Sequence, residues 1–109
     1  MKTVEHLRKA RKLIDAGWTR DSYARDDKGH TVDRFSDSAT CFCALGALDR
    51  VVVDSGGIAR LEDAFETLSS VLPARCNGSV VDFNDRVAKD KDEVLAAFDR
   101  AIAEEESRE

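Results

Sequence analysis

The chain has 109 residues, a common size for a single domain, and its 42% hydrophobic and 36% charged residues are typical of a globular protein. The formal net charge of −5 at pH 7 argues against nucleic acid or an anionic membrane as the main partner, since such partners are bound through clustered lysine and arginine. No apolar run approaches the roughly 20 residues that cross a bilayer, so we expect no membrane segment. From the length of the chain we expect one domain over residues 1–109.

The first predicted element is an amphipathic helix that begins near Thr3 and ends at Gly17. Its apolar positions recur at helical spacing, at Val4, Leu7, Ala10 and Ile14. Gly17 is expected to end the helix in the left-handed conformation, with Trp18 folded back onto the core. His6 lies at the border of the apolar stripe, where we expect it to be exposed.

Residues 19–37 lose the helical periodicity. The turn signal at residues 26–29 (DDKG) fits a small β-hairpin, and a long ordered loop fits the same pattern. The sequence leaves both arrangements open.

Residues 39–48 are the most informative segment because they contain no charged side chain. Small residues would occur on every side of a helix formed by this segment, and a helix that is apolar all round is buried all round. We therefore predict a buried central helix here. A buried strand is the alternative, but alanine, glycine and leucine favour the helix.

Two more amphipathic helices follow. One covers residues 58–72 and ends before Pro73, and the other begins at Asp90, a capping residue. Residues 74–90 between them are expected to be irregular, and residues 104–109 to fray. Together the elements predict a mainly α fold, a single-domain bundle of about four helices around the buried central helix, with room for a small β-hairpin.

Charge is unevenly distributed along the chain. Residues 1–20 carry six lysines and arginines against two acids, and residues 90–109 carry eight acids against three bases. This asymmetry favours packing the terminal helices side by side, or pairing two copies head to tail. Arg8, Lys9 and Lys12 could bind nucleic acid, but they carry no interleaved aromatics, and we expect a solvated face.

Three cysteines are too few for a disulfide framework, and residues 1–10 lack the features of a signal peptide, so we expect the reducing cytoplasm. The residues that could suggest zinc are Cys41, Cys43, Cys76 and His30. On a helix, Cys41 and Cys43 would point about 200° apart and could not share a tetrahedral metal. We expect no metal and no cofactor.

One combination of residues could carry nucleophilic chemistry. Cys43 or Cys41 near a helix N-terminus would feel the positive end of the helix dipole, which lowers the pKa of a thiol. His30 could then serve as the base, and Asp85 or Asn84 could orient it, as in a papain-like triad. The alternative is that apolar neighbours bury the thiols and that Asn84 and Asp85 satisfy loop backbone.

Several short motifs occur in a characteristic order: Gly17-Trp18, residues 23–26 (YARD) with Gly29, residues 43–48 (CALGAL), residues 83–85 (FND), Glu93-Val94 and residues 98–102 (FDRAI). This order resembles a family of short uncharacterised proteins of bacteria and their phages. The resemblance implies one compact domain and no assigned activity. It also marks Cys43, Asn84 and Asp85 as positions to test.

Because no specific catalytic motif is present, the sequence favours a small non-enzymatic interaction or regulatory module. Its expected partner is another protein or a second copy of the chain. A cysteine-dependent hydrolase or transferase that uses Cys43 or Cys41 is the second hypothesis. A nucleic-acid-binding regulator is the third, and the net charge speaks against it.

Overall fold

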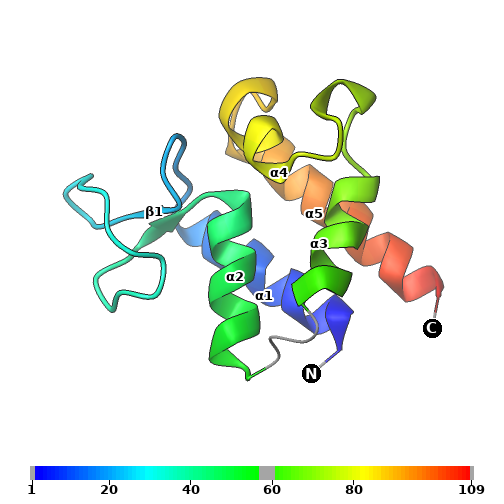
Figure 1. The fold of residues 1–109 in the computed structure, drawn as a ribbon, viewed down its shortest axis with the longest axis horizontal. Coiled ribbons are helices and arrows are strands. Elements are labelled where there is room, and N and C mark those ends of the chain that lie inside the picture. Colours follow the sequence, from blue (N-terminus) through cyan, green and yellow to red (C-terminus); the bar gives the residue numbers. More distant parts are fainter. Residues whose placement is uncertain (1, 57–60, 109) are drawn as a thin grey trace.

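The computed structural model describes residues 2–56 and 61–108. Four helices make up most of this part of the chain (Figure 1): α1 (Thr3–Ala16), α2 (Ala44–Asp54), α3 (Leu61–Ser70) and α5 (Lys91–Ser107). The shorter elements are β1 (Ala24–Arg25), β2 (Cys41–Phe42), a 3-10 turn (Ala74–Cys76), α4 (Val80–Asp82) and a π-helical turn (Phe83–Val87). The fold is therefore mainly helical with one small two-stranded sheet, as predicted. In the described residues, no helix combines the length and the apolar character that a membrane span needs.

The core lies where the four long helices meet. α1 packs against α2 and α5, and α3 packs against the same two helices. Each of the four contributes large, fully buried side chains, among them Leu7, Leu48, Leu68 and Phe98. Burying one such side chain contributes about 1.5–3 kcal/mol, so this contact region is the main source of stability.

α1 and α5 lie side by side, and their opposite charges meet across the contact (Figure 1). Three ion pairs join the two ends of the chain: Arg8–Glu106, Arg11–Asp99 and Lys91–Asp15. The uneven charge of the sequence is thus matched within one chain, which is the first of the two arrangements that we expected.

The prediction of a helix over residues 39–48 is wrong for the first half of that segment. β2 lies there and pairs antiparallel with β1, and α2 begins only at Ala44. The extended conformation is favoured because it supplies backbone partners: Phe42 N donates to Gly17 O at 2.9 Å, and Thr19 N donates to Phe42 O at 3.1 Å. The second half is helical and mostly buried, as predicted.

Gly17 ends α1, but not in the predicted left-handed conformation. Its φ of −171° is extended. Glycine is needed here for space, because a Cβ at this position would lie 2.3 Å from the backbone oxygen of Thr40. The close approach brings β2 directly against the end of α1.

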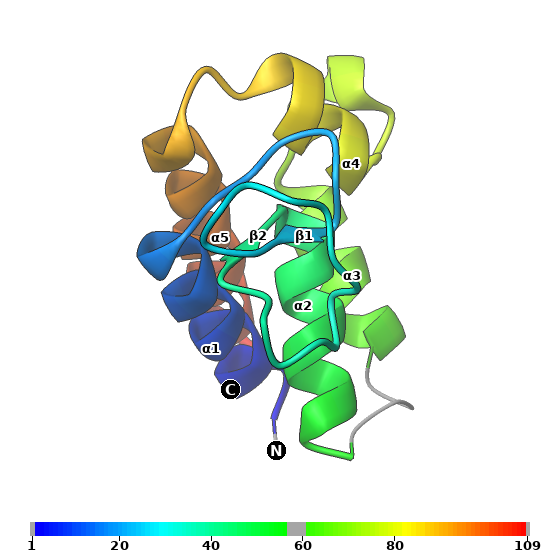
Figure 2. The same cartoon turned by 90° about the vertical axis from the view of Figure 1, so that its left-hand side faces the viewer.

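Residues 26–40 form a long loop that starts with a tight turn. Asp26 N donates to His30 O at 2.9 Å, and Gly29 is left-handed with a φ of 85°. The predicted turn is therefore present, and the segment directly after it pairs with β1 through a single antiparallel bridge, Arg25–Thr31, and through Val32 N, which donates to Ala24 O at 3.1 Å. The two-residue strand that pairs with β1 is β2. Figure 2 shows the loop crossing in front of α1 and α2.

Two other predictions are wrong. Residues 74–90 were expected to be irregular but contain α4 and two further helical turns. α5 continues to Ser107 where we expected fraying, and Arg108 beyond it pairs with Glu105 at 3.0 Å. The predicted start of the third helix at Ile58 lies outside the described residues.

Candidate functional site

The structure brings two of the predicted site residues to one pocket. Cys43 and Asp85 both line a hollow of about 450 Å³. The other described residues around it are Asp21, Ser22, Tyr23, Thr31 and Val81. His30 is not among them, because its side chain is 75% exposed on the turn and pairs with Asp26 at 3.5 Å. The predicted base is therefore not part of this pocket.

Asn84 lies beside the pocket and is fully buried. Its Oδ1 accepts from Trp18 Nε1 at 2.7 Å and from Ala44 N at 3.0 Å. Its Nδ2 donates to Thr19 O at 3.1 Å and to Asp85 Oδ1 at 2.8 Å. An asparagine amide has two donor and two acceptor positions, so all four are in use. Asn84 thus ties the end of α1, the start of α2 and the π-helical turn together.

Cys43 is the N-terminal capping residue of α2. Its Sγ accepts from Gly46 N at 3.3 Å. Burial raises the pKa of this thiol, and the backbone N–H groups of Gly46 and Leu45 oppose that shift without cancelling it. The negative charge of Asp85 raises the pKa further. The expected helix-dipole activation therefore does not prevail, and the thiol is protonated at neutral pH.

Cys41, the other candidate nucleophile, is half-buried in β2 and does not line the same pocket. Both cysteines and Cys76 are free thiols. Across residues 2–56 and 61–108, no group of three or more metal-ligating side chains could hold an ion.

The Asp85 carboxylate is held in a fixed position. Its Oδ1 accepts from Asn84 Nδ2 and also from Asp21 N at 3.1 Å. Asp21 adopts a left-handed φ of 61°, which aspartate tolerates better than most residues. The pocket therefore offers two carboxylates, hydroxyl groups and one protonated thiol, a set suited to binding a cationic group. No imidazole among the described residues lines it to activate the thiol.

His6 differs from the prediction, because it is fully buried. Its Nε2 lies 3.0 Å from Ser55 Oγ, and that hydroxyl donates to Val52 O at 2.9 Å. Since a serine has one hydroxyl proton, His6 is the donor in this pair. The pair therefore ties α1 to the C-terminal end of α2 and does not activate a serine nucleophile.

An exposed aromatic patch adjoins the pocket. Tyr23 and Phe35 are the exposed large hydrophobic residues of the described chain, at 45% and 40%. The guanidinium carbon of Arg34 lies 4.7 Å from the centre of the Tyr23 ring and 5.1 Å from that of Phe35. Arg34 Nε also lies 2.8 Å from Asp49 Oδ2. Burial raises the pKa of the Asp49 carboxyl above its ordinary value, and the nearby Arg34 offsets only part of that rise. We call Tyr23, Arg34 and Phe35 the aromatic face.

The loop that carries Phe35 is held by hydrogen bonds. Arg50 on α2 donates to Arg34 O at 2.9 Å and to Ser36 O at 3.0 Å. Arg25 donates to Gly29 O at 3.0 Å at the other end of the loop. The aromatic face is therefore presented on a fixed backbone. Tyr23 belongs to the YARD motif, but Arg34 and Phe35 belong to no motif, so the only sequence signal for this face is the presence of aromatic residues within a polar connection.

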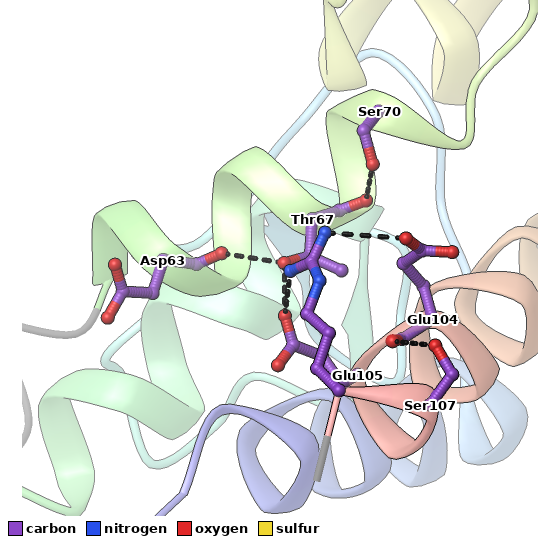
Figure 3. A network of polar contacts seen from close by, with 7 residues as sticks. Asp63, Thr67, Ser70, Glu104, Glu105 and Ser107 are labelled. Atoms are coloured by element: carbon purple, nitrogen blue, oxygen red, sulfur yellow. Dashed lines mark hydrogen bonds and ion pairs between the residues drawn. The ribbon is translucent and has the colours of Figure 1, made fainter.

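A separate polar network joins α3 to α5. The Thr67 hydroxyl on α3 contacts Glu105 Oε1 on α5 and also Asp63 O, and Arg108 pairs with the same Glu105 oxygen (Figure 3). Ser70 donates to Thr67 O at 2.7 Å. These groups are satisfied within the chain, so we assign the network to fastening α3 against α5.

The comparisons with known proteins point to one family. A family model described as "Family of unknown function (DUF6197)" matches residues 1–104. No curated protein and no solved structure matches the chain. The geometry of the chain itself is therefore the basis for any statement on function.

Proposed function

We propose that this chain, which belongs to the family of unknown function DUF6197, is a non-enzymatic interaction module that binds a partner protein through the aromatic face and the adjoining pocket. The observation that carries the proposal is the exposed Tyr23–Arg34–Phe35 stack, in which Arg34 and Phe35 lie on a loop fixed by hydrogen bonds. Tyrosine and arginine are among the residues that dominate the energetics of protein interfaces.

The order of the loop supports this proposal. Loops longer than about 12–15 residues without their own secondary structure are uncommon in compact domains and are usually functional. A face that is already fixed loses little conformational entropy on binding, which favours affinity. Arg50 would supply this preorganisation by holding both Arg34 O and Ser36 O.

The pocket defines the chemistry expected of the partner. Tyr23 belongs both to the aromatic face and to the pocket wall, so the two surfaces are continuous. Asp21 and Asp85 line the same pocket, and Asp85 is held by Asn84 and by the backbone of Asp21. The partner would place apolar surface on the two rings and a lysine or arginine side chain in the pocket.

The second hypothesis, a cysteine-dependent hydrolase or transferase, has one observation in its favour, because Cys43 and Asp85 share a pocket. The raised pKa of the Cys43 thiol and the position of His30 on the exposed turn argue for the binding module instead. Three free cysteines fit the cytoplasm as the place where this module works.

The experiment compares the wild type with Y23A/F35A and with the control K28A. Lys28 is exposed on the same loop, so its truncation leaves the aromatic face intact. Circular dichroism first verifies that all three proteins fold equally. Immobilised proteins then capture partners from the lysate of the source cells, quantified by mass spectrometry, and light scattering reports self-association.

We expect a protein, or a second copy of the chain, to be retained by the wild type and K28A and at least about tenfold less by Y23A/F35A. The retained partner should also lose affinity for D85N, which keeps the shape of the side chain but removes its charge. A strictly monomeric wild type with no partner that depends on Tyr23 and Phe35 would contradict the proposal.

A further inference from the structure

A separate groove runs between α1 and α2. It has a volume of about 520 Å³, within the range of ligand pockets. Its apolar lining comes from both helices and from the segment around β2, at Leu13, Ala39, Phe42 and Val51. Lys9 and Lys12 of α1 line one side, and Asp54 and Ser55 at the end of α2 line the other.

The basic side chains of α1 fall into two groups, one that contacts α5 and one that lines the groove. Arg8 and Arg11 pair with carboxylates of α5. Lys9 and Lys12 line the groove, are exposed, and have no carboxylate partner within the described residues. They are three residues apart on a helix, so their side chains are neighbours on one face.

The α2 side of the groove does not neutralise these lysines. Asp54 is the carboxylate among the described lining residues, and its Oδ2 lies 2.7 Å from Arg50 Nε. Its charge is therefore already matched by Arg50. In a chain with a net charge of −5, this groove combines an apolar floor with two unmatched positive charges.

We propose that the groove between α1 and α2 docks an acidic amphipathic segment of a partner protein. Its apolar side chains would lie on Leu13, Phe42 and Val51. Its carboxylates would meet Lys9 and Lys12, because charge complementarity selects a partner of opposite sign and excludes a basic one. This inference does not depend on the aromatic face, which lies on a different set of residues.

The test uses full-length protein and a fluorescein-labelled peptide of about 16 residues, with leucines at helical spacing and glutamates between them. A second peptide carries lysine in place of every glutamate. Fluorescence anisotropy is measured for the wild type, for K9E/K12E and for the control K28E/K89E. Lys28 and Lys89 are exposed and lie outside the groove, so the control makes the same change in net charge elsewhere. A single-stranded oligonucleotide and anionic lipid vesicles serve as competing probes.

We expect the acidic peptide to bind the wild type and the control equally, and K9E/K12E at least about tenfold more weakly. Binding should also weaken as salt is raised, a readout on the wild type that needs no variant. Equal binding of the lysine peptide, or an unchanged affinity of K9E/K12E, would overturn the proposal. Tighter binding of the oligonucleotide or the vesicles through the same two lysines would assign the groove to that partner and would overturn it as well.

Discussion

The substitution N84A should strongly destabilise the fold, although Asn84 lies outside the four long helices. Asn84 Oδ1 satisfies Ala44 N, a buried donor, and the half-buried Nε1 of Trp18. Its Nδ2 satisfies Thr19 O. Leaving a buried polar group without a partner costs about 1–3 kcal/mol. We assign about 2 kcal/mol to Ala44 N and about 1 kcal/mol to each of the other two, so the expected loss is about 4 kcal/mol. This is a large part of the 5–15 kcal/mol typical of a domain.

The measurement is urea unfolding at neutral pH, followed both by the fluorescence of Trp18 and by circular dichroism. Coincidence of the two transitions verifies that unfolding is two-state. D85N is the matched control, because it keeps an oxygen to accept from Asn84 and Asp21 and should lose less than about 1 kcal/mol. N84D places a carboxylate 2.8 Å from Asp85 Oδ1, so it should be unstable at pH 7 and recover as acid protonates one of the pair. A loss below about 1 kcal/mol in N84A would refute the central role of this side chain.

The other predictions concern the start of α2. G46A should lower the free energy of unfolding by about 1–3 kcal/mol, because the added Cβ would lie 2.2 Å from Tyr23 O. Alanine usually favours a helix over glycine, so an unchanged urea midpoint would contradict this reasoning. The Cys43 thiol should react with iodoacetamide only after unfolding, more slowly than Cys41, and rapid native-state modification would support the enzymatic hypothesis instead. Since burial raises the pKa of the Cys43 thiol, its contribution to stability should be complete below about pH 8.5 and lost as the pH rises through the folded value, an effect that C43S should lack.

The long helices could be predicted from the sequence because one face of each meets the core. In α1 and α5 the apolar residues recur at helical spacing, and the structure buries those positions. Residues 39–48 offered no such contrast, and their composition favoured a helix over the whole segment although its first half is extended. Its conformation is decided by partners remote in the sequence, such as Gly17 O for Phe42 N. Local propensity carries no information on such contacts.

Part of the candidate site could be predicted from the sequence, and the rest depends on contacts between residues far apart in the chain. The alternative to a catalytic role was that Asn84 satisfies backbone groups, and it does so for Thr19 and Ala44. The pocket shared by Cys43 and Asp85 follows from this bond network. The place of His30 depends on the turn at residues 26–29, which holds it by its own hydrogen bonds to Asp26 and away from the thiol. The aromatic face depends on the path of a long loop, which no periodicity describes.

The motifs that carry the family resemblance build the frame of the molecule. Gly17 and Gly46 allow backbone to approach within the space that a Cβ would fill. Asn84 then joins Trp18 to the first amide of α2. These contacts are internal. They fix where the loop of residues 26–40 begins and ends, but they do not determine which side chains the loop exposes to solvent. Among the groups that face solvent, Arg34, Phe35 and the lysines of the groove lie outside the motifs, and Tyr23 lies within one. A protein that keeps the frame can therefore change its partner by changing the loop and the groove, and the specificity of this chain should be sought there.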